Sequence, residues 1–329
     1  MGFSFLLRLK QLFRRVANSP DSYRVTVSYT KGNAVFVIFR LLTYFSAYFY
    51  ALAILPPFRF TDDGFAVTAA EPWIKEKTLV IAQYIQSYVN LHAGKGHELV
   101  FIDLFAGNGL YSLGARSELF AAPALLTLSL DLPITRYIFC AADQDQLNIL
   151  KIRVNKYFRG KNVLLLKGKP EELVASLMHY VPVTPHKASV FCLADSFSFD
   201  LEFETVQKLA GLQINFLIPF CFALNDKLNY RFYLRDARTK LSNYLTKEGA
   251  DQVERNTGNN RTFYKRLVQQ YQTNMLALGY NLSLSAHKAD SGLMELPVYQ
   301  IGFFSKEFST QSIRNTVEAA GHTQFELFQ

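Results

Sequence analysis

Residues 99–109 read LVFIDLFAGNG, an apolar strand that ends in Asp103 and continues directly into a turn of small residues, Ala106 to Gly109. Glycines in such a turn let a ligand approach the backbone where a Cβ atom would clash. In a parallel sheet, ligands bind at the carboxyl ends of the strands, which is where this turn lies. The stretch therefore predicts a small-molecule site. The alternative is a glycine turn that only joins a strand to a helix.

The residues of this turn favour S-adenosylmethionine (SAM) over a dinucleotide. Gly107, Gly109 and Ser112 approach the G-x-G-x-x-G spacing of dinucleotide binders, but the third glycine is missing. The carboxylate of Asp103 would repel a pyrophosphate, whereas it suits the ammonium group of SAM. A dinucleotide loop also leads straight into a helix, and here the next helix is predicted only at Ala122-Pro123. An NAD-type oxidoreductase is therefore disfavoured.

After residue 70 the sequence alternates between strand and helix patterns, which predicts an α/β fold. The expected architecture is a class I methyltransferase (Rossmann-like) sheet, mostly parallel, closed by an antiparallel strand pair and carrying a helical insertion at 226–278. Strands are predicted at 98–104, 136–142, 163–166, 189–194, 214–220, 280–286 and 298–304. Helices are predicted from 71–73, at 122–130, at 147–158 and at 263–275, the last stopped by Gly279. These elements belong to a predicted domain at 61–329, preceded by a separate segment at 1–60.

Acidic residues follow three of the predicted strands, so their carboxylates are expected along one rim of the sheet. Asp103 is expected to face the methionine amino group of SAM, directly or through water, and Asp143 the ribose hydroxyls. Asp195 is expected near the transferring methyl group, although capping of the next helix is an equally strong alternative, and Asp145 is expected to be a helix cap. The predicted cofactor-binding residues are Asp103, Phe105, Ala106, Gly107, Gly109 and Asp143. The predicted catalytic residues are Asp195, Ser196 and Phe197.

Charge and cysteine content bound the class of protein. The 329 residues carry a formal net charge of +8, but residues 1–60 and 226–275 hold all of the excess, and the remainder is mildly acidic. The three cysteines, Cys140, Cys192 and Cys221, are far apart and lie in apolar runs. This pattern indicates buried thiols in a reducing, cytoplasmic compartment, and neither a metal site nor a disulfide framework.

The apolar stretch at 34–55 is long enough to span a bilayer. However, Arg40 lies inside it, and the basic residues before it would place everything after residue 60 outside the cell, away from SAM. Three interpretations remain open: a membrane tether, a hydrophobic arm packed on a partner, or an extension that is not part of the natural domain.

A basic pattern marks the predicted insertion. Lys227, Arg231, Arg235 and Arg238 recur at helical spacing with tyrosine and phenylalanine between them. Such residues would form one basic stripe along a helix and suit phosphate contacts and base stacking on a nucleic acid substrate. The alternative is a solvated helix face whose aromatic side chains pack inward.

The quoted motifs resemble the three-Cys-motif partner family over roughly residues 68–306. FIDLFAGNG, the Trp73/Lys75/Lys77 helix, Glu118 to Leu126, the LGY at 278–280 and PVYQIGFFSK at 297–306 are similar to that family's elements. The resemblance implies a SAM-methyltransferase-like protein and a partner protein bearing three cysteines. Two departures stand out, because Ala121-Ala122-Pro123 replaces a Gly-Ser-Pro sequence and Asp195-Ser196-Phe197-Ser198 replaces an Asp-Pro-aromatic-Gly turn. Two functions therefore stay open: a methyltransferase acting on a nucleic acid or on a partner-presented substrate, and a catalytically inactive interaction subunit.

Overall fold

The computed structural model describes residues 59–92, 98–114, 116, 118–181, 188–309 and 311–312. All of them belong to the second of two units into which the chain divides, Ala53–Gln329. The apolar stretch predicted at 34–55, and all but two residues of the predicted segment 1–60, lie outside the described residues. Within the described part, none of the helices combines the length and the apolar character needed to cross a bilayer.

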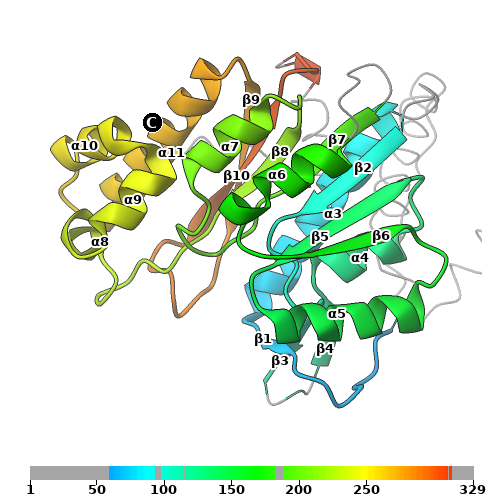
Figure 1. Ribbon diagram of the computed structural model, residues 1–329. Helices are drawn as coiled ribbons and strands as arrows, with labels where there is room; N and C mark the ends of the chain where they lie inside the picture. Colours follow the sequence, from blue (N-terminus) through cyan, green and yellow to red (C-terminus); the bar gives the residue numbers. More distant parts are fainter. Residues whose placement is uncertain are drawn as a thin grey trace, which may run out of the picture. The chain divides into compact units, whose positions relative to one another are not determined.

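A seven-stranded sheet forms the centre of the unit (Figure 1). Its strand order is β6-β5-β2-β7-β8-β10-β9, and every neighbouring pair is parallel except those that involve β10. This order, with one reversed strand beside the end, confirms the predicted class I methyltransferase fold. The strands are β2 Glu98–Asp103, β5 Arg136–Ala141, β6 Val163–Lys167, β7 Ala188–Leu193, β8 Asn215–Phe220, β9 Asn281–Lys288 and β10 Val298–Ser305.

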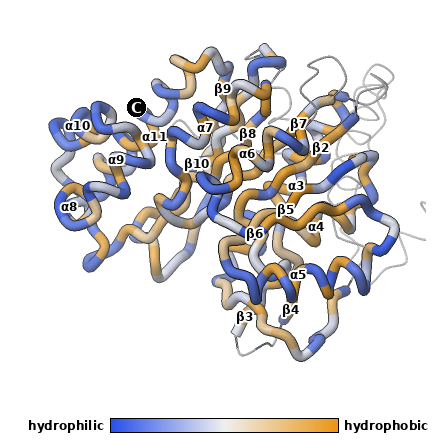
Figure 2. The backbone as a smooth tube through the Cα atoms, in the orientation of Figure 1, coloured by the Kyte–Doolittle hydropathy of each residue, from blue (hydrophilic) through white to orange (hydrophobic). Residues whose placement is uncertain are grey.

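Two apolar cores cover the two faces of this sheet, as the strand alternation requires. In β2, Val100 and Ile102 belong to one core, while Leu99 and Phe101 belong to the other. The first core is completed by α6 Pro170–Tyr180, α7 Phe203–Ala210 and the helical insertion, and the second by α3 Pro72–His92, α4 Pro123–Ser129 and α5 Gln144–Tyr157. Figure 2 shows the hydrophobic residues concentrated along the central strands.

A second, three-stranded sheet follows the glycine turn, where the sequence analysis assigned no structure. It has the order β1-β3-β4, with β1 at Thr68–Ala69, β3 at Leu110–Leu113 and β4 at Glu118–Ala121. β3 and β4 form an antiparallel hairpin whose turn uses Gly114 and Arg116 at positive φ. Its strands of four residues are too short to stand out by periodicity alone. The hairpin lies between the glycine turn and α4. This helix begins at Pro123, with Ala122 as its N-cap, which confirms the helix start predicted at 122–123.

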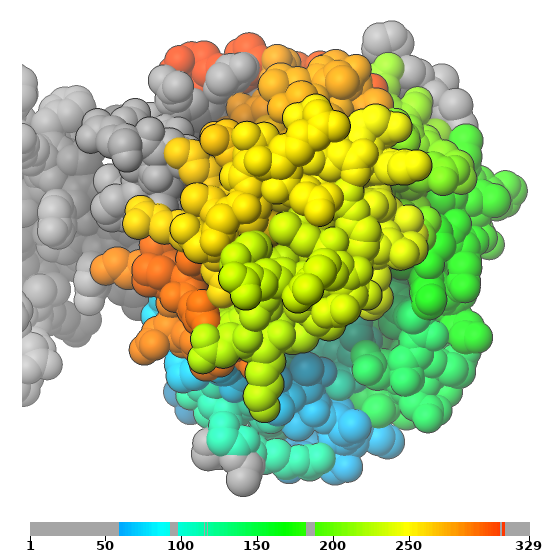
Figure 3. Space-filling model, turned by 90° about the vertical axis from the view of Figure 1, so that its left-hand side faces the viewer, coloured from blue at the N-terminus to red at the C-terminus, as the bar shows by residue number. Residues whose placement is uncertain are grey.

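The insertion consists of four helices: α8 Tyr230–Arg235, α9 Arg238–Leu245, α10 Lys247–Arg255 and α11 Asn260–Ala277. They gather on one face of the unit (Figure 3). The expectation of one continuous basic helix is therefore wrong. Lys227 precedes α8, and Arg238 begins α9 after a break at Asp236 and Ala237. The four basic residues therefore belong to three segments, the loop before α8, α8 and α9, and not to one helix.

The segment before β1 is packed against α5. Phe60 is buried, and its ring lies 5.4 Å from Tyr157 in an edge-on contact and 6.4 Å from Phe158. A domain boundary between residues 60 and 61 would therefore remove an aromatic side chain from the second core.

Candidate functional site

The two glycines of the turn at the end of β2 have different roles. Both have positive φ, +56° at Gly107 and +87° at Gly109. A Cβ atom on Gly107 would meet only Gln146 Oε1, at 3.4 Å, so this glycine borders open space. A Cβ atom on Gly109 would lie 2.7 Å from Leu125, so that glycine is required by packing under the loop. Gly107 is therefore the position where a ligand can approach the backbone.

The first cleft, of about 620 Å³, lies at the carboxyl ends of β2, β5 and β6. Asp143 lines it, with an exposed side chain, and its Oδ1 accepts a hydrogen bond from the Gln146 amide at 2.9 Å. Asp143 is thus also the N-cap of α5, and the cap predicted for Asp145 is wrong, because Asp145 lies in the first turn of that helix. Gly168, Lys169 and Phe199 line the same cleft and were missed by the sequence analysis.

The second cleft, of about 490 Å³, lies on the other side of the glycine turn, toward α3 and β1. Four residues line both clefts: Phe105, Gly107, Gln146 and Ser196. Ala106, Gly109, Asp195 and Phe197 line the second. The structure therefore gathers the predicted cofactor and catalytic residues around two adjoining clefts, with the exception of Asp103.

Asp103 lies beneath the glycine turn and lines neither of these clefts. It is 1% exposed, and its Oδ1 accepts a hydrogen bond from the Phe105 amide at 3.0 Å. Burial, with the nearby Asp195 carboxylate, raises the pKa of Asp103 to about 7 despite that hydrogen bond. The side chain is therefore placed to hold the turn in shape rather than to reach a ligand directly.

Asp195 forms a buried ion pair with Lys77 of α3. The Lys77 ammonium lies 2.7 Å from both carboxylate oxygens, and the two side chains are 3% and 5% exposed. Burial alone would lower the pKa of Lys77, but the Asp195 carboxylate outweighs it, and the pKa is raised. The pair ties the loop after β7 to the first turns of α3. The helix cap considered for Asp195 is not formed, because α7 begins only at Phe203.

Ser196 and Phe197 continue this loop in a constrained form. The Ser196 hydroxyl donates to the Ser198 carbonyl at 2.7 Å and accepts from the Ser198 amide at 3.3 Å. Phe197 has a φ of +49°, which is unfavourable for a side chain of this size. Its ring lies 5.9 Å from that of Trp73 in α3. The packing against Trp73 holds an aromatic wall beside the second cleft.

Glu71 fastens the loop between β9 and β10 over the same cleft. Its carboxylate accepts hydrogen bonds from the Trp73 indole at 2.7 Å, the Ser291 hydroxyl at 2.5 Å and the Gly292 amide at 2.9 Å. Burial would raise the pKa of Glu71, but these hydrogen bonds lower it. Leu293, which is 47% exposed, thereby comes to line the second cleft.

Comparison with known proteins finds solved structures of similar fold but assigns this chain to no family. No protein-family model matches the sequence, and no curated protein is significantly similar to it. Among solved structures, a Legionella pneumophila protein of the DUF519 family is similar at 8% identity over 73% of this chain and 88% of its own, with a TM-score of 0.44. The METTL16 methyltransferase domain is similar at 11% identity over 93% and 92%, with a TM-score of 0.41. The fold assignment rests on the order and direction of the strands in this chain.

The four basic residues predicted to bind substrate have separate surroundings. Arg238 contacts Asp251, lies 3.4 Å from Glu254, and donates to the Ala250 carbonyl at 3.0 Å, so it links α9 to α10. The Arg231 guanidinium donates to the Tyr230 hydroxyl at 3.0 Å and remains exposed. Lys227 and Arg235 are also exposed. Three of the four therefore remain open to a phosphate.

Proposed function

We propose that this chain binds SAM in the first cleft and transfers the methyl group to an acceptor that enters through the second. The observation that carries the proposal is the junction of the two clefts at Phe105, Gly107, Gln146 and Ser196, on the carboxyl rim of a class I methyltransferase sheet. A donor and an acceptor held on either side of that junction would meet in line, and positioning of this kind supplies much of the rate of a group transfer.

The residues of the first cleft fit SAM. Asp143 presents an exposed carboxylate whose Oδ1 accepts the helix-cap hydrogen bond, and a ribose diol could donate hydrogen bonds to the same carboxylate. Gly107 leaves space for a ligand at the turn. No helix N-terminus follows the turn directly, as a pyrophosphate would require, because the β3–β4 hairpin intervenes. When bound, SAM would supply the electrophilic methyl group.

On the acceptor side, the chain would orient the substrate rather than remove a proton through Asp195. Both oxygens of that carboxylate accept hydrogen bonds from Lys77, and the Ser196 hydroxyl is engaged with Ser198. These contacts give Asp195, Ser196 and Phe197 a positioning role at the mouth of the second cleft. The same contacts favour the second candidate, a SAM-binding subunit without turnover that acts through a partner. In that case the resemblance to the three-Cys-motif partner family indicates a protein with three cysteines as the partner.

Asp143→Asn is expected to weaken SAM binding about tenfold, the equivalent of one charge-assisted hydrogen bond. Asparagine keeps the cap of α5, so the fold should be unaffected. The matched control is Asp145→Asn, which removes the same charge two residues farther along the chain. The Asp145 side chain is exposed and does not line the first cleft. Isothermal titration calorimetry with SAM measures both. Gly107→Val should have the larger effect and abolish binding, because it places a branched side chain at a positive φ where the ligand approaches. Wild-type affinity in either site variant would refute the cofactor site.

Exposed basic residues of the insertion are expected to contact the phosphates of a nucleic acid substrate. Replacing both Lys227 and Arg235 by Ala should reduce the slope of log affinity against log salt by about two for a DNA duplex, roughly one for each lost contact. The control variant removes two exposed lysines of α5, Lys151 and Lys156, and should leave the slope unchanged. Fluorescence anisotropy across a salt series gives the slopes. Equal slopes in all three proteins would exclude this surface and favour a partner-presented substrate.

A further inference from the structure

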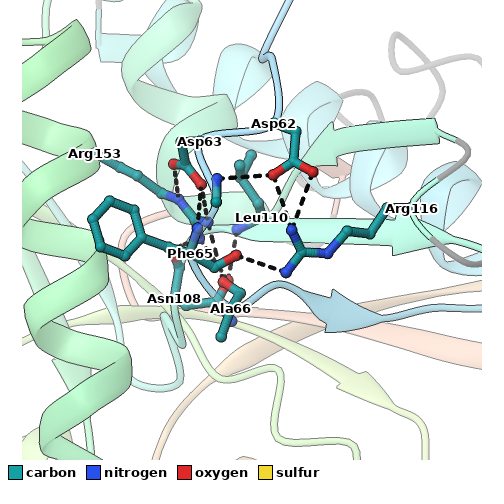
Figure 4. A network of polar contacts seen from close by, with 9 residues as sticks. Asp62, Asp63, Phe65, Ala66, Asn108, Leu110, Arg116 and Arg153 are labelled. Carbon is teal, nitrogen blue, oxygen red and sulfur yellow. Dashed lines mark hydrogen bonds and ion pairs between the residues drawn. The ribbon is translucent and has the colours of Figure 1, made fainter.

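A single buried guanidinium joins the glycine turn to the segment before β1 (Figure 4). Arg153 of α5 is 0% exposed. It donates to the two Asp63 oxygens at 2.8 and 2.9 Å, to the Asn108 carbonyl at 2.7 Å, to Asn108 Oδ1 at 3.0 Å and to the Ala66 carbonyl at 3.0 Å. These contacts use all five N–H groups that a guanidinium possesses.

Asn108 is the residue between the two glycines of the turn, and it is 4% exposed. Besides accepting from Arg153, its Oδ1 accepts from the Leu110 amide at 3.0 Å, and its Nδ2 donates to Thr68 Oγ1 at 3.1 Å. Glycines on both sides make the local backbone permissive, so its course must be set by contacts from outside the turn. Arg153 supplies two of those contacts, both to Asn108, the residue that follows Gly107 in the chain.

Asp63 balances the buried charge of Arg153. Its side chain is 5% exposed, and the hydrogen bond from Arg153 lowers its pKa, so it is a carboxylate at neutral pH. The preceding residue, Asp62, behaves differently, because it pairs with Arg116 at 3.0 Å on the surface. Of these two adjacent carboxylates, only Asp63 contacts Arg153, which in turn contacts the glycine turn.

We infer that Arg153 is a positioning residue for the SAM-binding turn and that Asp63 couples the segment at residues 59–67 to the affinity of that turn. The inference rests on the proposed SAM site. Arg153 itself lines neither cleft and acts through Asn108, which lines the second cleft, so its effect should appear as a change in the shape of the turn. Loss of the Asp63 charge should let the guanidinium shift away from Asn108 toward other acceptors, since a buried charge seeks a partner.

The test compares Asp63→Asn with Asp62→Asn, which make the same change in neighbouring residues. Asp63→Asn is expected to weaken SAM binding about tenfold in calorimetry, measured well below the melting temperature. Asp62→Asn is expected to change the affinity less than twofold. Equal affinities for Asp63→Asn and the wild-type protein, with or without a lower melting temperature, would overturn the inference, because a purely structural role would reduce stability alone.

A second measurement needs no ligand. Amide hydrogen exchange of Gly107 to Leu110 should accelerate in Asp63→Asn and in Arg153→Lys, relative to the amides of β7. In Arg153→Lys the reason is that a single ammonium group cannot reach both Asp63 and Asn108 as the guanidinium does. Unchanged exchange of the turn in both variants would reject the positioning role. If the wild-type protein binds no SAM, the proposed function fails, and the exchange result still decides whether Arg153 positions the turn.

Discussion

Lys77→Met is expected to lower the free energy of unfolding by about 3–5 kcal/mol, because it leaves the Asp195 carboxylate buried without its counter-ion. Both residues line the second cleft, but their side chains are at most 5% exposed, so water replaces the lost partner poorly. Urea denaturation followed by circular dichroism measures the change. The loop that carries Ser196 and Phe197 should loosen at the same time, since Lys77 ties it to α3 by two hydrogen bonds, and without them the packing of Phe197 on Trp73 remains.

A double-mutant cycle separates the pair from its surroundings. The double variant Lys77→Met with Asp195→Leu should recover most of the lost stability, giving a coupling energy above about 2 kcal/mol. Lys75 of the same helix provides the matched control, because its pair with Glu118 is 44% and 47% exposed. Lys75→Met should cost less than about 1 kcal/mol. A cost for Lys77→Met no larger than that of Lys75→Met would contradict the interpretation of a buried, ionised pair.

Asp103→Asn is expected to stabilise the protein at alkaline pH, by up to about 4 kcal/mol at pH 8. The pKa of Asp103 is raised from 3.8 to about 7 in the folded state, so folding disfavours the carboxylate. The wild-type protein therefore has its full stability from this group below about pH 4 and loses it as the pH rises toward 7. Asparagine can still accept the hydrogen bond from the Phe105 amide but carries no charge.

The gain in Asp103→Asn should shrink below about 2 kcal/mol at pH 5 and vanish toward pH 4, which denaturation at three pH values would show. Asp131→Asn serves as the control, since a hydrogen bond from Lys161 lowers the pKa of that exposed carboxyl. It should produce no gain at pH 8. A stabilisation by Asp103→Asn of equal size at every pH would mean that the side chain does not titrate as a buried acid.

The fold could be predicted from local patterns, because each strand of the main sheet is a short apolar run bounded by polar residues. The strands at 98–104, 136–142 and 214–220 are confirmed within one or two residues by β2, β5 and β8. The β3–β4 hairpin was missed because its strands have only four residues each, and the third strand of its sheet, β1, has two residues and lies about 40 positions earlier. The prediction of a basic stripe was wrong because the sequence spacing of the four basic residues is the same whether or not the helix is interrupted, and here it is interrupted between Arg235 and Arg238.

The two buried cations, Lys77 and Arg153, are recognisable in the sequence by their positions on apolar helix faces. Lys77 lies among the residues of α3 that face the core, and Arg153 lies between Leu150 and Val154 on the buried face of α5. A charged residue in such a position must be paired, because an isolated buried charge is too costly. The sequence therefore implies that partners exist for both residues, but it cannot name Asp195 or Asp63.

By itself the sequence determined the α/β class, the closing strand pair and the glycine turn at the end of β2, since all three follow from periodicity and backbone freedom within a few neighbouring residues. Only the tertiary structure decided that Asp143 faces a cleft and caps a helix, that Asp103 lies beneath the turn, and that Asp195 is held by Lys77 across 118 positions of the chain. The physical reason is that burial and charge pairing depend on which segments the sheet brings together. Strand-end carboxylates that look alike in sequence thereby acquire different chemistry.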